Sequence, residues 1–254
     1  MSFVTAGGVS LHVQDLGAGP PVVMIHGLLI GSLASWYFTA APTLARAHRV
    51  RLYDLRGHGR SAHARTGYDV ATLAADLAAV TADLAAPIDV VGHSWGGLVA
   101  LRFAIDHPAR VRRLAIVEAP LPPSQASQLA GFLDGAATPE AIVAALPEPL
   151  RAAIAGGKRQ ATRLLRALSA LAFDSSLLAD LRAQPDFTDA ELATIRAPLL
   201  AAYGDRSACR AAGDRLARFG ATLAILAGGH YLHLDATAAL TAALDAHLAE
   251  PARG

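Results

Sequence analysis

Cysteine is almost absent from this sequence, and its scarcity limits the chemistry that the chain can carry. The 254 residues include a single cysteine, Cys209, so no disulfide can form within the chain and a zinc site built from several cysteines is excluded. Charge is also scarce, since 17% of the residues are charged and the net charge is +1. Because no broad basic face can be built from these residues, we expect neither nucleic acid nor an anionic membrane as a partner.

Long uninterrupted apolar runs are missing as well. No stretch of about 18 uncharged apolar residues occurs, so no membrane span is expected. The first eight residues lack the charged and apolar regions of a signal peptide, and we therefore expect a cytoplasmic protein. Apolar residues nevertheless make up 53% of the chain, which is ample material for a buried sheet. The length suits one large α/β domain with an insertion.

Short apolar runs alternate with helix-length segments along most of the chain. Residues 9–16 alternate apolar and polar positions, as a half-exposed edge strand does. The other runs lack this alternation, which is typical of parallel strands covered on both faces: they are residues 21–25, 50–53, 88–91, 114–117, 199–202 and 223–226. Helices are expected over residues 34–47, 69–86, 95–106 and 235–250. This order predicts an α/β fold with a mostly parallel central sheet of about eight strands and helices on both faces.

The alternation stops between residues 121 and 194, where no strand candidate occurs. This region is predicted to form short helices separated by prolines, over residues 124–134, 139–146, 158–173, 176–182 and 188–195. An all-helical insertion between two strands predicts a cap over the sheet edge where open α/β sheets bind ligands. An additional structural bundle is the alternative. The expected organisation is a core of residues 1–120 and 195–254 with a helical cap of residues 121–194 inserted in it.

Residues 92–96 read Gly-His-Ser-Trp-Gly, which is a G-x-S-x-G motif placed between an apolar strand and a helix. A serine on such a sharp turn sits in strained backbone and needs small neighbours, which Gly92 and Gly96 provide. The start of the following helix directs free N–H groups and a positive dipole end toward an anion formed there. We therefore predict that Ser94 is a nucleophile.

A serine hydroxyl is a weak nucleophile at neutral pH and needs a base nearby, oriented by an acid. The last strand is followed by His230, the predicted base, and the strand before it is followed by Asp205, the predicted acid. Both lie where the carboxyl ends of parallel strands bring loops together. Glu118, after the strand at residues 114–117, is the alternative acid, and His233 is the alternative base.

The loop after the strand at residues 21–25 is predicted to complete the site. Gly27 lets backbone approach the substrate, so the N–H groups of Leu28 and Trp95 are placed to form an oxyanion hole. His26 is expected to hold loop carbonyls, and His93 is expected to point its side chain elsewhere.

Taken in order, these motifs resemble the α/β-hydrolase superfamily over almost the whole chain. They are His26-Gly27, residues 53–61 (Tyr-Asp-Leu-Arg-Gly-His-Gly-Arg-Ser), residues 92–97, Gly204-Asp205 and Gly229-His230. The resemblance implies a structural role for the loop that contains Asp54, Arg56 and His58, and a lid where the helical insertion falls. A serine at position 94 argues against epoxide hydrolases and haloalkane dehalogenases, which resemble this fold but use a carboxylate nucleophile.

The chemistry expected from these residues is acyl transfer to water through an acyl-enzyme, with no metal and no organic cofactor. The expected substrate is a small-molecule or carrier-bound ester or thioester of a hydrophobic acid, contacted by Trp36, Phe38 and Phe132. These aromatic residues equally fit a purely structural role between cap and core. The alternatives on the same triad are a C–C bond hydrolase and a lactonase, with hydroxynitrile-lyase or perhydrolase chemistry less favoured. In a different class, the chain would be a ligand receptor that keeps the fold.

Overall fold

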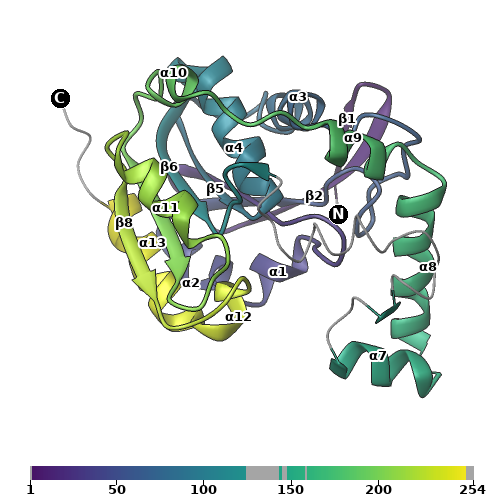
Figure 1. The fold of residues 1–254 in the computed structure, drawn as a ribbon. Coiled ribbons are helices and arrows are strands. Elements are labelled where there is room, and N and C mark those ends of the chain that lie inside the picture. Colours follow the sequence, from purple (N-terminus) through teal and green to yellow (C-terminus); the bar gives the residue numbers. More distant parts are fainter. Residues whose placement is uncertain (1, 124–142, 145–147, 158, 250–254) are drawn as a thin grey trace.

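The computed structural model describes residues 2–123, 143–144, 148–157 and 159–249 (Figure 1). Its centre is an eight-stranded sheet in the order β1-β2-β4-β3-β5-β6-β7-β8. The strands are β1 (Ser2–Ala6), β2 (Val9–Leu16), β3 (Pro21–Ile25), β4 (Arg49–Tyr53), β5 (Ile88–His93), β6 (Val111–Val117), β7 (Leu199–Gly204) and β8 (Thr222–Leu226). β2 pairs antiparallel with both β1 and β4, and every other neighbouring pair is parallel. The mostly parallel sheet predicted from the sequence is therefore confirmed.

Strand β1 was not among the predicted strands. It forms a hairpin with β2, with register partners from Ser2↔Val13 to Ala6↔Val9. Gly7 and Gly8 make the turn, and both have positive φ angles. A two-residue hairpin turn requires this backbone conformation at both positions, so a Gly-Gly pair before an alternating run is a signal from which β1 could have been predicted.

Helices cover both faces of the sheet. The helices of the described residues are α1 (Ala34–Tyr37), α2 (Ala41–Leu44), α3 (Val70–Val80), α4 (Trp95–Asp106), η1 (Pro108–Arg110), α7 (Glu148–Ala155), α8 (Arg159–Phe173), α9 (Leu177–Ala183), α10 (Asp189–Leu192), α11 (Arg210–Ala217), α12 (Leu232–Asp235) and α13 (Thr237–Ala249). Among the described residues, no helix is long and apolar enough to cross a membrane.

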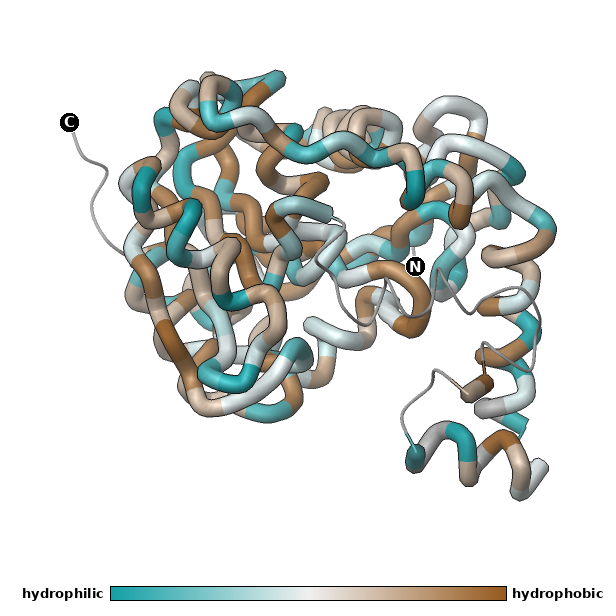
Figure 2. The backbone as a smooth tube through the Cα atoms, in the orientation of Figure 1, coloured by the Kyte–Doolittle hydropathy of each residue, from teal (hydrophilic) through white to brown (hydrophobic). Residues whose placement is uncertain are grey.

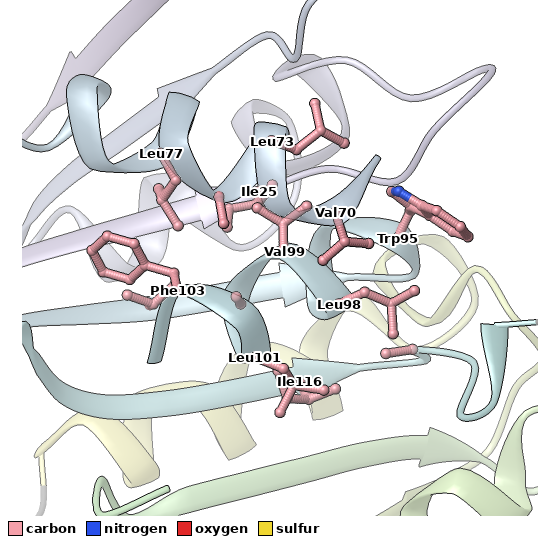
Figure 3. Packing of buried hydrophobic residues seen from close by; sticks show 14 of the residues in the cluster. Ile25, Val70, Leu73, Leu77, Trp95, Leu98, Val99, Leu101, Phe103 and Ile116 are labelled. Carbon is pink, nitrogen blue, oxygen red and sulfur yellow. The ribbon is translucent and has the colours of Figure 1, made fainter. Parts of the chain in front are cut away.

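The core has two layers because successive side chains of a strand point to opposite faces of the sheet. Val23 and Ile25 of β3 join the cluster under α3, α4 and α11, whereas Val22 and Met24 join the cluster under α2 and α13. Figure 3 shows the first layer, in which side chains of α3 and α4 meet those of the sheet. Apolar residues follow the buried strands through the centre of the molecule (Figure 2). The carboxyl ends of β3 and β5 to β8 are thereby fixed at one edge.

Several predicted helices are shorter than expected. The segment of residues 34–47 divides into α1 and α2, and Pro42 lies in the first turn of α2, where its missing N–H costs nothing. Helix α3 begins after Asp69, whose carboxylate accepts a hydrogen bond from the N–H of Thr72, and it ends at Val80. The last predicted helix divides into α12 and α13.

The segment that the sequence predicts as a cap contains α7 to α10, which lie between β6 and β7. The sequence does not predict helix α7, because Pro147 and Pro149 indicate breaks, yet position 149 lies in the first turn of this helix. The helices predicted over residues 124–134 and 139–146 fall largely outside the described residues. In Figure 1, α7 and α8 stand to one side of the sheet, whereas α9 and α10 lead back past α3 and α4 to the core.

Two contacts join the described helices of this segment to the core. Leu168 and Ala172 of α8 pack with Leu29 and Ile30, in the loop after β3. Near α10, Glu191 forms an ion pair with Arg102 of α4. The described helices thus reach the core at the loop beside the predicted oxyanion hole and at the outer face of α4.

Candidate active site

Ser94 lies on a tight turn between β5 and α4. Its backbone has φ 55° and ψ −122°, an unfavourable conformation for a residue with a side chain. The turn is held by a hydrogen bond from the Ser94 N–H to the carbonyl of Val117 at 2.8 Å. Both flanking glycines are required by space, because a Cβ on Gly92 would lie 2.2 Å from the Gly96 carbonyl oxygen and one on Gly96 would lie 2.5 Å from that of His26. The chain geometry therefore presents the Ser94 hydroxyl at the sheet edge.

His230 reaches Ser94 from the loop after β8. Its Nε2 lies 3.0 Å from the Ser94 Oγ, which is hydrogen-bonding distance. The backbone carbonyl of His230 accepts a hydrogen bond from Nε2 of His93 at 2.8 Å, so the residue beside the nucleophile helps to hold the loop. The structure brings together the nucleophile and the base that the sequence predicts, across 136 positions of the chain.

The carboxylate nearest to the other imidazole nitrogen belongs to Glu118. Its Oε2 lies 3.4 Å from His230 Nδ1, and the Glu118 side chain is fully buried. Glu118 directly follows β6 and has a φ of 57°, a left-handed conformation that is uncommon for a long side chain. Nucleophile, imidazole and carboxylate therefore form one continuous chain of side chains.

The loop after β7 holds the Glu118 carboxylate. The N–H of Gly204 donates a hydrogen bond to Oε1 at 2.5 Å, and the Ser207 hydroxyl donates one to Oε2. Ser207 Oγ in turn accepts a hydrogen bond from the N–H of Cys209 at 3.0 Å. Each donor favours a negatively charged carboxylate facing His230. The sequence does not identify Ser207 as a functional residue, because a serine in a loop carries no distinguishing signal.

Asp205, the acid predicted from the sequence, makes different contacts. Its Oδ1 accepts a hydrogen bond from the N–H of Gly228 at 2.9 Å and lies 3.4 Å from Arg206 Nη1. Its side chain is 48% exposed. The structure thus corrects the predicted partner of His230 from Asp205 to Glu118. The reason is local: Asp205 ties the β7 loop to the β8 loop, as a turn aspartate does.

The predicted oxyanion-hole amides lie on either side of Ser94: Leu28 belongs to the loop after β3, and Trp95 is the first residue of α4. A Cβ on Gly27 would lie 3.1 Å from the Ser94 Cβ, so the loop after β3 runs directly beside the nucleophile. Within the described part of the chain, neither the Leu28 N–H nor the Trp95 N–H has a hydrogen-bond partner. Free amides at this position are what a developing oxyanion requires. Their catalytic role stays a prediction.

Comparison with known proteins agrees with this geometry. A family model described as the alpha/beta hydrolase fold matches residues 20–189. The chain belongs to the alpha/beta hydrolase fold family. Among solved structures, the thioesterase domain from the curacin biosynthetic pathway is 30% identical, with a TM-score of 0.67 over 96% of this chain and 97% of that domain. An N-acyl homoserine lactone degrading enzyme is 25% identical, with a TM-score of 0.76 over 96% of this chain and 99% of that enzyme.

Among curated proteins, a 2-hydroxy-6-oxo-2,4-heptadienoate hydrolase from Pseudomonas putida is 40% identical over 124 residues. That match covers 46% of this chain and 44% of the relative, so it spans less than half of the relative's length. The three proteins differ in the reactions that their names state, and membership of the fold family alone does not determine what this chain acts on.

Of the three aromatic residues predicted to contact substrate, Trp36 is placed elsewhere. Its indole is fully buried in the cluster under α2 and donates a hydrogen bond to the Ile25 carbonyl at 3.0 Å. The prediction is wrong for Trp36 because an indole filling the core has no surface left for a substrate. Phe38 is 79% exposed and packs edge-on against Tyr37, and its role in binding stays a prediction. Phe132 lies outside the described residues.

Histidines near the site hold loops by accepting and donating backbone hydrogen bonds. Nε2 of His26 accepts a hydrogen bond from the Leu55 N–H, and Nε2 of His58 accepts one from the Leu29 N–H. Their Nδ1 atoms lie 2.7 and 2.8 Å from the carbonyls of Gly27 and Arg56. Both rings are therefore neutral, each with its proton on Nδ1.

Burial acts in the same direction on the pKa values of these histidines. It lowers the pKa of His58 to about 3, with a further contribution from the neighbouring His26. Burial also lowers the pKa of His26 and, to about 4, that of His233. His233 lies with its ring centroid 4.7 Å from that of His93. The residue whose imidazole is hydrogen-bonded to Ser94 is His230 rather than the alternative His233.

Proposed function

We propose that the protein is a serine hydrolase that cleaves a carboxylic ester or thioester of a hydrophobic acid through an acyl-enzyme. One observation carries the proposal: a hydroxyl, an imidazole and a buried carboxylate lie side by side in space. The distance from Ser94 Oγ to His230 Nε2 is 3.0 Å, and the distance from His230 Nδ1 to Glu118 Oε2 is 3.4 Å. This arrangement of nucleophile, base and orienting acid is the requirement for activating a serine.

In the proposed reaction, Ser94 Oγ attacks the substrate carbonyl carbon while His230 Nε2 takes the hydroxyl proton. The resulting oxyanion is stabilised by the amides of Leu28 and Trp95. His230 then gives the proton to the leaving alcohol or thiol, which leaves an acyl group on Ser94. A water molecule repeats the sequence and releases the acid. Glu118 stabilises the imidazolium that forms in each half and keeps the proton of the neutral ring on Nδ1.

The apolar surroundings of the oxyanion loop support a hydrophobic acyl group. Leu28 and Leu29 are half-buried and pack against the core, and Leu29 and Ile30 also pack with Leu168 of α8. A pocket with apolar walls and a few polar groups at its reacting end binds hydrophobic acids well. We propose that this acid is presented on a small molecule or on a carrier, without a metal or an organic cofactor.

A fluorophosphonate probe followed by mass spectrometry tests the activated serine. We expect one equivalent of label on Ser94 in the wild type and none in Ser94→Ala. A chromogenic ester should give a burst of product, and Ser94→Ala should lower kcat by a factor on the order of 10⁵–10⁶. Absence of label on Ser94 together with absence of turnover on short and long acyl esters and thioesters would refute the proposal.

Carbon–carbon bond hydrolysis is the second candidate, and the similarity to the heptadienoate hydrolase favours it. A panel that contains acyl esters, acyl thioesters, lactones and a dienoate with a cleavable C–C bond separates these activities by kcat/KM. A ligand receptor of this fold would instead bind tightly without turnover, and its affinity would not change in Ser94→Ala.

A further inference from the structure

Three side chains of types that can bind a metal ion lie close together on the Nδ1 side of His230, away from Ser94. Glu118, Cys209 and His230 each direct one ligand atom to this point, and these atoms lie within 4.8 Å of one another. The residues come from three separate places, namely the end of β6, the residue before α11 and the loop after β8. Glu118 and Cys209 are buried, and His230 is half-buried.

The donor set suits a borderline-soft divalent cation. Zinc and cadmium accept thiolate, imidazole and carboxylate ligands, whereas magnesium and calcium prefer oxygen alone. Around a tetrahedral zinc ion with bonds of about 2.0 Å to nitrogen and oxygen and about 2.3 Å to sulfur, neighbouring donors lie about 3.3–3.5 Å apart. His230 Nδ1 and Glu118 Oε2 already have a separation of 3.4 Å. The Cys209 sulfur has to move by no more than about 1.5 Å to match.

The loop between β7 and α11 lies beside this point, since it contains Ser207 and Cys209. Asp205, Arg206 and Ala208 of that loop are exposed, and Ser207 is half-buried. A loop whose residues lie at the surface opens at low cost compared with a core element. This surface loop is therefore the expected path of an ion to the cluster.

We propose that Glu118, Cys209 and His230 form a site for Zn²⁺ or Cd²⁺, with a fourth position left for water, and that an ion bound there silences the hydrolase. The loss of hydrolysis on ion binding rests on the proposed function. On binding, the ion replaces the thiol proton of Cys209, which passes to solvent. The ion takes the lone pair of His230 Nδ1, so the single proton of the neutral ring moves to Nε2.

That shift of the imidazole proton explains the loss of activity. With its proton on Nε2, His230 has no lone pair facing Ser94 Oγ, and the ring cannot accept the hydroxyl proton. Because the Glu118 carboxylate then binds the ion, it no longer orients the imidazole of His230. Because the ion lies behind the histidine and not where the substrate carbonyl binds, we expect kcat to fall while KM changes little.

Cadmium binding can be measured without any substrate. A thiolate bound to Cd²⁺ gives a ligand-to-metal charge-transfer band in the ultraviolet, and this chain offers one thiol. Titration of the wild type and of Ser94→Ala with CdCl₂ should produce the band with one equivalent of ion. Cys209→Ser should show no band, and circular dichroism should confirm that this variant is folded. A missing band in the wild type would overturn the proposed site.

Inhibition by zinc supplies the second measurement. We expect ZnCl₂ to lower the kcat of the wild type and a chelator to restore it. Cys209→Ser keeps the backbone N–H that bonds to Ser207. Measured against its own metal-free kcat, this variant should need at least about tenfold more zinc for half-inhibition. Equal sensitivity of the two proteins would overturn the proposal, as would cadmium binding through Cys209 without any effect of zinc on kcat.

The two measurements separate this proposal from the proposed function. A cadmium band in a protein whose Ser94 resists the fluorophosphonate probe would keep the metal site and refute the serine hydrolase. If Ser94 is labelled and the protein is active but shows no cadmium band, the serine hydrolase is supported and the metal site is refuted.

Discussion

Glu118 and Asp205 occupy equivalent positions in the sequence and opposite environments in the structure. Each is an acidic residue that directly follows a buried parallel strand, β6 for Glu118 and β7 for Asp205. Glu118 is fully buried and faces His230, whereas Asp205 is 48% exposed and bonds to a backbone amide. A position directly after a strand therefore identifies candidates for the acid, and the burial and hydrogen bonds of each carboxylate decide between them.

The cost of placing Glu118 where it lies points to a specific use. A non-glycine residue in the left-handed region costs about 1–2 kcal/mol, and a buried charge needs compensating partners. Gly204 and Ser207 provide hydrogen bonds to its two oxygens, so the surrounding structure holds the carboxylate in one orientation. Asp205 needs no such support, since water and a backbone amide suffice for an exposed turn residue.

The largest predicted effect separates the two acids directly. We expect Glu118→Gln to lower kcat/KM by about 10³–10⁴, because an amide that replaces an orienting carboxylate can hold the histidine in the wrong tautomer and cannot stabilise the imidazolium. Asp205→Asn should stay within about threefold of the wild type, because the group is exposed and screened. Steady-state kinetics on a chromogenic ester measures both.

The two substitutions are matched, since each removes one charge and keeps the side-chain shape. The opposite ranking, with Asp205→Asn the more severe, would return the acid to the position predicted from the sequence. Thermal unfolding of each variant separates a loss of catalysis from a loss of folded protein.

The sequence predicts the fold better than it predicts this acid. Runs such as residues 114–117 and 199–202 identify strands because a strand covered on both faces must be apolar throughout, a property of local composition. Ser94 could be predicted because its turn needs glycines at fixed neighbouring positions. The choice between Glu118 and Asp205 depends on φ at one residue and on the path of one loop, and neither leaves a local pattern. The predicted substrate contact of Trp36 is wrong for a related reason, since an aromatic residue after a loop fits a core and a pocket equally well.

A second prediction moves the acid rather than removing it. Ser207 Oγ donates to the same Glu118 oxygen that faces His230, so a carboxylate at position 207 lies within reach of the imidazole. In the Glu118→Gln background, we expect Ser207→Asp to raise kcat/KM about 10- to 100-fold above the single variant. Ser207→Asn in the same background is the control, and an equal gain there would mean that packing rather than charge is responsible.

The contrast between buried and exposed groups extends to the histidines of the loop after β4. The pKa of buried His58 is lowered to about 3, whereas an unfolded histidine has a value near 6.5. Below pH 6.5 the unfolded chain therefore takes up a proton that the folded chain refuses. The contribution of neutral His58 to the free energy of unfolding is therefore complete above pH 6.5 and is lost as the pH falls toward 3.

We expect His58 to contribute a loss of about 2 kcal/mol in the free energy of unfolding between pH 7 and pH 5. Urea denaturation at the two pH values measures it. The decrease should be smaller by that amount in His58→Gln than in His63→Gln, the control in which an exposed histidine is replaced. Identical pH dependence in both variants would show that His58 is protonated without cost in the folded protein.

The smallest predicted effect concerns the hydrogen bond that orients Glu118. Ser207→Ala removes a donor to the Oε2 that faces His230, so the carboxylate keeps its charge and loses one of two fixed contacts. A single hydrogen bond to a charged group contributes about 1.5 kcal/mol or somewhat more. Because only part of this energy stabilises the transition state, kcat should fall about three- to tenfold while KM stays unchanged.

A merely structural role for Ser207 would give a different pattern. Ser207→Thr keeps the hydroxyl and should restore most of kcat, whereas Ser176→Ala removes a comparable serine–carboxylate bond, to Asp180, at a site remote from the imidazole. If both alanine variants lose stability equally and only Ser207→Ala loses kcat, the bond acts through Glu118. Equal kcat in the two variants would mean that burial and the Gly204 amide orient the acid without help from the hydroxyl.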